Sequence, residues 1–153
     1  MRAHLPLTLF AAAVAAGPVR AAVLDPSFTE SVYLPNTGLA DSTVFAWAPD
    51  GSSRLFVARK TGQVRIVQGG ATPSLLATPF VTVAPVFTNS ECGVIGLAFD
   101  PDYVTNKYVY LFVTVSATEQ QIIRYTDASN VGIDKTVILS GLPTVGNNHD
   151  GGG

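Results

Sequence analysis

The chain has 153 residues, a net charge of −2 and only 13% charged residues. Proteins that bind nucleic acid usually carry a basic surface, so this charge balance argues against that class. A hydrophobic content of 47% with so few charges also argues against a disordered chain.

The first 21 residues have the three-part layout of a secretory signal peptide. A short basic start ends at His4, an apolar run covers residues 5–16, and small residues precede a predicted cleavage site after Ala21. The apolar run is too short to span a bilayer comfortably, which disfavours a membrane anchor. We therefore predict export to the periplasm or the extracellular space, with residues 22–153 as the mature segment and no membrane span within it.

After residue 22 the sequence consists of short apolar or alternating runs bounded by Gly, Pro, Asn and Asp, which is typical of β-strands. We predict eight strands, over residues 43–48, 54–59, 63–67, 75–83, 94–99, 108–115, 121–125 and 136–139. We predict turns at residues 49–52, 61–62, 69–70, 102–107 and 127–130. This spacing indicates an all-β fold, which could be a sandwich, a barrel or a propeller.

An internal repeat distinguishes among these folds. The segments Ala46 to Asp50 and Ala98 to Asp102 share the order small residue, aromatic residue, any residue, Pro and Asp. Each is followed by a segment rich in aromatic and β-branched residues, and the two prolines lie 52 residues apart. A period near 50 residues is typical of a propeller blade. The sequence thus predicts about two blades of a β-propeller and the start of a third.

The repeat also predicts structural roles. Trp47 and Phe99 are expected to be core aromatics, and Asp50 and Asp102 to cap tight turns rather than to bind a metal. The sole cysteine, Cys92, is expected to be a buried thiol, the alternative being a disulfide to a cysteine beyond this chain.

The most specific stretch is residues 91–103, with the sequence ECGVIGLAFDPDY. Together with the segments at residues 36–39, 49–51, 123–125 and 148–152, it resembles the glucose/sorbosone dehydrogenase family over nearly the whole mature segment. The resemblance implies a six-bladed β-propeller that oxidises sugars with pyrroloquinoline quinone (PQQ). This chain would then be its N-terminal portion, covering about the first two blades and ending within a catalytic loop.

Two positions depart from the family pattern. Cys92 stands where Arg or Asn is usual, and Asp100 stands where His is frequent. These departures leave the predicted fold intact but put the substrate, and even the activity, in question.

The resemblance implies that His149 is the catalytic base, which removes the proton of the sugar's anomeric hydroxyl while hydride passes to the quinone. Asn148 could hold an imidazole nitrogen, and Asn148 and Glu91 are the predicted substrate-binding residues. The alternatives are a solvated histidine for His149 and an exposed turn carboxylate for Glu91.

The resemblance also implies calcium beside PQQ, whose three carboxylates need cationic partners. Lys60, Arg65 and Arg124 are expected to be solvated or at strand edges, and no metal ligand is assigned. The cofactor-binding residues are therefore expected beyond Gly153. We expect part of an exported aldose dehydrogenase that passes electrons to an external acceptor and is inactive as this chain alone. The alternative is a secreted, non-enzymatic propeller that binds a protein or a glycan.

Overall fold

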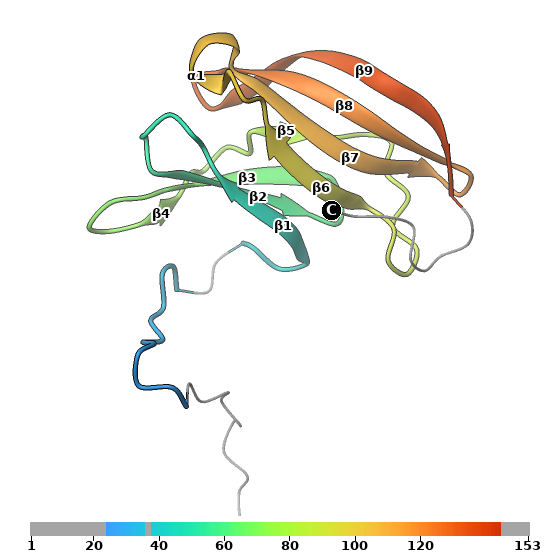
Figure 1. The fold of residues 1–153 in the computed structure, drawn as a ribbon. Coiled ribbons are helices and arrows are strands. Elements are labelled where there is room, and N and C mark those ends of the chain that lie inside the picture. The colour runs from blue at the N-terminus through green and yellow to red at the C-terminus, as the bar shows by residue number, and fades with distance from the viewer. Residues whose placement is uncertain (1–23, 36–37, 145–153) are drawn as a thin grey trace, which may run out of the picture. The chain divides into compact units, whose positions relative to one another are not determined.

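The computed structural model describes residues 24–35 and 38–144, and the chain divides into a unit of residues 1–32 and a unit of residues 33–153. In the first unit, the Asp25 carboxylate accepts hydrogen bonds from the amide and the hydroxyl of Ser27, at 2.9 and 2.6 Å. All described strands belong to the second unit, where they form two antiparallel sheets (Figure 1). This arrangement confirms the all-β prediction.

The first sheet, sheet A, contains five strands: β1 (Ser42–Trp47), β2 (Arg54–Arg59), β3 (Gln63–Gln68), β4 (Ser74–Leu75) and β5 (Val81–Thr82). β1, β2 and β3 pair in sequence order, as short connections between antiparallel strands favour. Both β4 and β5 pair with β3.

The predicted strand over residues 75–83 is wrong, because the structure divides it into β4 and β5. Val67 pairs with Leu75, whereas Val64 pairs with Val81, so three residues of β3 correspond to six on the other side. The extra residues leave the sheet around Pro79, which has no N–H to contribute to the ladder. The alternating pattern of the sequence does not reveal this interruption.

The second sheet, sheet B, contains four strands in sequence order: β6 (Val94–Phe99), β7 (Tyr108–Ser116), β8 (Glu119–Ala128) and β9 (Val131–Pro143). Ser129 and Asn130 join β8 to β9 with φ values of 55° and 77°, the left-handed conformation that tight hairpins require. β9 extends beyond the predicted residues 136–139 at both ends. Its side chains are mostly exposed, so its apolar pattern is weak although it pairs with β8 along its length.

The connection from β6 to β7, predicted as a turn, contains the one-turn helix α1 (Tyr103–Asn106). The Asp100 carboxylate accepts hydrogen bonds from the Asp102 amide and the Asn106 side chain, at 2.9 and 2.8 Å. In the described part of the chain, no helix has the length and apolar character needed to cross a bilayer.

The two sheets pack through one apolar core. Its fully buried members include Phe56 from β2, Ile66 from β3, Leu111 from β7 and Ile123 from β8. The ring of Phe56 lies edge-on to that of Phe99, with centroids 5.0 Å apart, which is a favourable aromatic geometry. This contact places Phe99 against the core, as predicted.

The prediction that Trp47 is a core residue is wrong for the described structure. Its side chain is 49% exposed and meets the ring of Tyr33 edge-on, at a centroid distance of 5.5 Å. Phe99, its equivalent in the repeat, packs toward sheet A. In the described part of the chain no sheet packs on the face of sheet A that carries Trp47, so the Trp47 side chain stays partly exposed.

The 52-residue repeat also preserves the face of the sheet on which each strand residue lies, although the paired residues of the following strands lie 54 positions apart. Ala46 pairs with Phe56 in sheet A, and Ala98, 52 residues later, pairs with Tyr110 in sheet B. Phe56 belongs to the face of sheet A that sheet B covers. Tyr110 therefore marks the corresponding face of sheet B.

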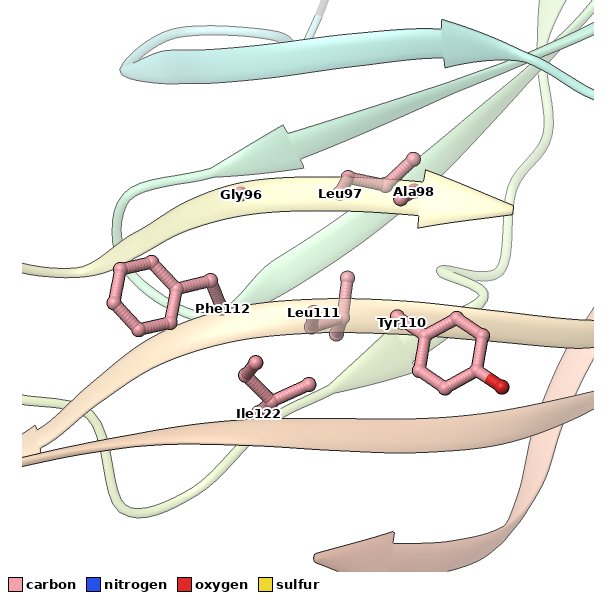
Figure 2. A pocket seen from close by; sticks show the side chains of 7 residues that line it. All are labelled: Gly96, Leu97, Ala98, Tyr110, Leu111, Phe112 and Ile122. Atoms are coloured by element: carbon pink, nitrogen blue, oxygen red, sulfur yellow. The ribbon is translucent and has the colours of Figure 1, made fainter. Parts of the chain in front are cut away.

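That face of sheet B carries a shallow apolar hollow of about 350 Å³. It is lined by Gly96, Leu97, Ala98, Tyr110, Leu111, Phe112 and Ile122 (Figure 2). Because the equivalent face of sheet A is buried under a neighbouring sheet, the repeat predicts that a further blade packs on this hollow. The two sheets are thus two consecutive propeller blades.

Candidate functional site

Glu91 lies in a tight turn that leads into β6. The Cys92 amide donates a hydrogen bond of 2.9 Å to the Asn89 carbonyl, and Ser90 has a left-handed backbone with φ of 45°. Glu91 is exposed, whereas the adjacent Cys92 is fully buried. This confirms the predicted burial of Cys92. We call residues 89–93 the Glu91 turn.

The Glu91 turn packs on the β2–β3 connection of sheet A. The Val94 amide donates to the Lys60 carbonyl at 3.2 Å, and the Lys60 ammonium donates to the Ser90 carbonyl. Gly93 has a φ of +151°, and a Cβ built on it would lie 2.6 Å from the Lys60 carbonyl oxygen. Only glycine fits here without displacing backbone.

The end of β9 lies at the same end of sheet B as the Glu91 turn. The Thr114 amide, late in β7, donates to the Gly93 carbonyl at 2.8 Å, and Pro143 of β9 pairs with Glu119 at the start of β8. The described chain stops one residue later, at Thr144. Asn148 and His149 lie outside the described residues, so of the three predicted site residues the structure places Glu91 alone.

The charged groups near the Glu91 turn are engaged with protein atoms. Arg59 donates to the Ala40 carbonyl and to the Gln63 side chain, both at 2.8 Å. Hydrogen bonds from the Gln121 side chain and then the Gly141 amide lower the pKa of Glu119. These contacts stabilise the sheet end and its hairpins.

The described residues do not fit the binding of PQQ by themselves. A tricarboxylate needs several cations directed at one place, yet Arg59 and Lys60 both donate to oxygens of the protein. In residues 24–35 and 38–144, no group of three or more acidic, histidine or cysteine side chains could hold a metal ion.

The opposite end of the sheets carries a polar cluster that the sequence did not predict. Arg54 makes five side-chain hydrogen bonds there, to Ser52, Asp127, Asn130, Asp50 and Tyr103. Arg54 and Asp50 belong to the first blade, and the Arg54 partners Asp127, Asn130 and Tyr103 belong to the second. The cluster therefore connects the blades. A hollow of about 450 Å³ borders it, but every N–H of the guanidinium already has a partner within the protein.

Burial and the hydrogen bonds within this cluster shift the pKa values of Asp50 and Tyr103. Burial alone would raise the pKa of Asp50, but hydrogen bonds from Ser52 and Arg54 outweigh burial and lower that pKa to about 2. Burial, followed by the hydrogen bond to Asp127, raises the pKa of Tyr103. The Asp50 carboxylate is thus charged and the Tyr103 phenol is neutral, which suits a structural connection.

The predicted turn caps have mixed outcomes. Asp50 accepts the Ser52 amide at 3.1 Å, which confirms it as a cap. Asp102 makes no side-chain cap bond, so its prediction is wrong. Asp100 caps this turn instead and also accepts the Tyr110 hydroxyl at 2.8 Å. Because these bonds suit a carboxylate, the unusual residue at position 100 has a structural explanation.

The three cations expected to be solvated or at strand edges are partly exposed, and each also contacts other protein groups. Lys60 contacts Ser90, and Arg65 donates to the Leu76 carbonyl at 2.6 Å. The guanidinium of Arg124 lies 4.0 Å from the ring centroid of Tyr108, a cation–π geometry. These partners are distant in sequence or depend on the sheet register, so a linear pattern does not reveal them.

Comparison with known proteins agrees with this architecture. The family model for glucose/sorbosone dehydrogenase matches residues 39–153. A Thermus thermophilus protein described as an oxidoreductase (glucose dehydrogenase) is 27% identical, with a TM-score of 0.59 over 69% of this chain and 31% of its own. The PQQ-bound aldose sugar dehydrogenase of Streptomyces coelicolor is 25% identical, with a TM-score of 0.58 over 70% of this chain and 32% of its own.

A more distant likeness concerns the fold alone. The soluble aldose sugar dehydrogenase of Escherichia coli, in its apo form, is 16% identical, with a TM-score of 0.55 over 67% of this chain and 30% of its own. The present chain spans about a third of the length of these solved structures. Two blades in a third of the length is the proportion expected for six. The chain belongs to the glucose/sorbosone dehydrogenase family, of whose six-bladed β-propeller it forms about two blades.

Proposed function

We propose that the protein to which these blades belong oxidises an aldose at its anomeric carbon and passes the electrons to an external acceptor. The observation that carries this proposal is the family match over residues 39–153, which includes the Glu91 turn. A structural relative described as PQQ-bound supports PQQ as the hydride acceptor. We propose calcium as its companion ion, as the family resemblance implies.

In this proposal His149 is the base that takes the proton of the anomeric hydroxyl. An imidazole titrates near neutral pH, which suits that role. Asn148 and Glu91 contact the sugar, Glu91 through hydrogen bonds from sugar hydroxyls to its carboxylate. The exposure of Glu91 supports its part.

Chain geometry permits these residues to act together. β6 and β9 are separated by three strand spacings, or roughly 14 Å. His149 follows Thr144 by five residues, which can extend over at most roughly 18 Å. The five residues from Thr144 to His149 are therefore enough to span the distance from the end of β9 to the Glu91 turn.

We further propose that residues 1–21 direct export and are removed, and that residues 22–153 alone are inactive. The layout of the N-terminal sequence supports the first point, and the lack of a cationic cluster among the described residues supports the second. Amino-terminal sequencing of the secreted protein should begin at Ala22. An uncleaved Met1 on the exported protein would contradict the signal-peptide assignment.

The test of function is dye-linked sugar oxidation by the whole protein, with PQQ and calcium added and a panel of aldoses as substrates. We expect activity with at least one aldose and a fall in kcat of roughly 10²- to 10⁴-fold for His149→Gln, the contribution typical of a general base. Glu91→Ala should raise KM. The control is Asp102→Ala, an exposed carboxylate at the other end of sheet B. No oxidation of any aldose by the wild-type protein would refute the proposal.

A further inference from the structure

We infer that Lys60, in the first blade, is a positioning residue that sets the orientation of Glu91 in the second blade and thereby the affinity for sugar. The inference rests on the proposed function, because it takes Glu91 as a sugar contact. Lys60 would act through the backbone of the Glu91 turn. It follows β2 of sheet A, whereas the turn leads into β6 of sheet B.

The side-chain contact of Lys60 is with the peptide group that joins Ser90 to Glu91. Its ammonium donates to the Ser90 carbonyl oxygen, which belongs to that peptide. Because a peptide unit is planar, fixing its carbonyl oxygen also fixes the direction in which the chain leaves toward the Glu91 Cα. Lys60 can therefore orient Glu91 without touching the sugar.

The backbone of Lys60 is itself held firmly at the junction of the blades. Its amide donates to the Asp41 carbonyl, just before β1, at 2.8 Å, and its carbonyl accepts the Val94 amide at 3.2 Å. Gly93 packs against the same carbonyl and against the start of the lysine side chain. The backbone from which the Lys60 side chain extends is therefore held in place.

The part of the turn that Lys60 contacts is also the part that the core does not hold. Cys92 is fully buried and anchors the second half of the turn, whereas Ser90 and Glu91 are exposed. Ser90 also has a φ of 45°, a left-handed conformation that is uncommon for residues other than glycine. An unusual backbone at an exposed position requires a stabilising contact, and the Lys60 ammonium supplies one.

The experiment compares three variants of the whole protein in dye-linked oxidation of the best aldose substrate. Lys60→Met keeps an apolar side chain of similar length against Gly93 but loses the donor. Lys60→Arg keeps a charged donor. Lys135→Met is the control, because Lys135 also donates to a backbone carbonyl in the segment between β5 and β6, that of Ala84 at 3.3 Å. Lys135 is exposed, whereas Lys60 is partly buried.

We expect Lys60→Met to raise KM about three- to tenfold, the range for loss of one partly exposed charged hydrogen bond, with kcat within about twofold of wild type. Lys60→Arg should restore most of the affinity, and Lys135→Met should leave KM unchanged. A purely structural role for Lys60 would lower the melting temperature without a change in KM.

A second readout does not depend on enzymatic activity. The rate at which iodoacetamide alkylates Cys92, followed by mass spectrometry of its peptide, reports opening of the Glu91 turn. Lys60→Met should accelerate alkylation about three- to tenfold, and Lys135→Met should not.

The two readouts separate the possible failures. A wild-type protein that oxidises no aldose would refute the proposed function, while alkylation would still test whether Lys60 holds the turn. Unchanged alkylation in Lys60→Met would overturn the positioning role. Faster alkylation with an unchanged KM would overturn the connection from Lys60 to sugar affinity.

Discussion

Arg54 in β2 and Asp127 in β8 form an ion pair between the two blades, with an Nη1 to Oδ2 distance of 2.6 Å. The side chains are 10% and 2% exposed, so both charges are largely removed from water. The Tyr103 hydroxyl donates to the same carboxylate oxygen at 2.5 Å, and the Asn130 amide donates to the other oxygen at 2.8 Å. The blades are thus joined by an apolar core and, at one end, by a saturated polar cluster.

Replacing Arg54 by Met should strongly destabilise the whole protein. The substitution leaves the Asp127 carboxylate buried without its cation, which typically costs about 3–5 kcal/mol. Chemical denaturation of the whole protein measures the change. The control is Lys107→Met, because Lys107 lies 3.8 Å from Asp50 and is 38% exposed, and such a pair contributes about 1 kcal/mol or less. Equal losses in the two variants would contradict the assigned role of Arg54.

Acid should weaken the same cluster within a defined pH window. The pKa of Asp50 is lowered from 3.8 to about 2 in the folded protein, so its charged form is favoured by folding. This contribution, about 2 kcal/mol, is complete above pH 4 and disappears as the pH falls through about 2. The free energy of unfolding of wild type and Asp50→Asn, compared between pH 5 and pH 2, should therefore converge toward the acid end. A constant difference over that range would contradict the lowered pKa.

Gly93→Ala should be more harmful than another glycine substitution with similar backbone strain. Gly93 and Gly70 have φ values of +151° and +132°, but a Cβ would meet the Lys60 carbonyl at 2.6 Å in the first case and nothing within 4 Å in the second. Both variants lose the conformational freedom of glycine, at a cost of about 1–3 kcal/mol. Gly93→Ala adds steric crowding of about 1–3 kcal/mol. Equal melting temperatures of the two variants would show that the contact between Gly93 and the Lys60 carbonyl adjusts at little cost.

The sequence predicts strands well where burial alternates and poorly where it does not. β6 is predicted with the correct ends, and buried and half-buried residues alternate over its first four positions. β9 was predicted too short because most of its side chains are exposed, and only its pairing with β8 reveals its length. Backbone pairing leaves little trace in composition when a strand lies at the edge of a sheet.

The candidate site could be predicted only in part. Residues 91–103 contain enough family-specific sequence to indicate the family, which the family match confirms, whereas the role of Glu91 in the site stays a prediction. The contact of Lys60 with Ser90 joins residues 30 positions apart, and that of Arg54 with Asp127 joins residues 73 apart. Contacts of this range depend on how two sheets stack, which no local pattern specifies.

The free face of sheet B should make residues 22–153 associate when they are expressed alone. The face is the repeat equivalent of the surface of sheet A that sheet B buries, and its hollow is lined mainly by apolar side chains. Exposed apolar surfaces of this kind promote association.

Ile122→Lys places a charge within the hollow and should reduce association in light scattering, whereas Val104→Lys, at an exposed position of α1, should not. In the whole protein Ile122→Lys should instead destabilise the fold, because a third blade would bury the charge. If Ile122→Lys leaves both association and stability unchanged, this face does not seat a blade.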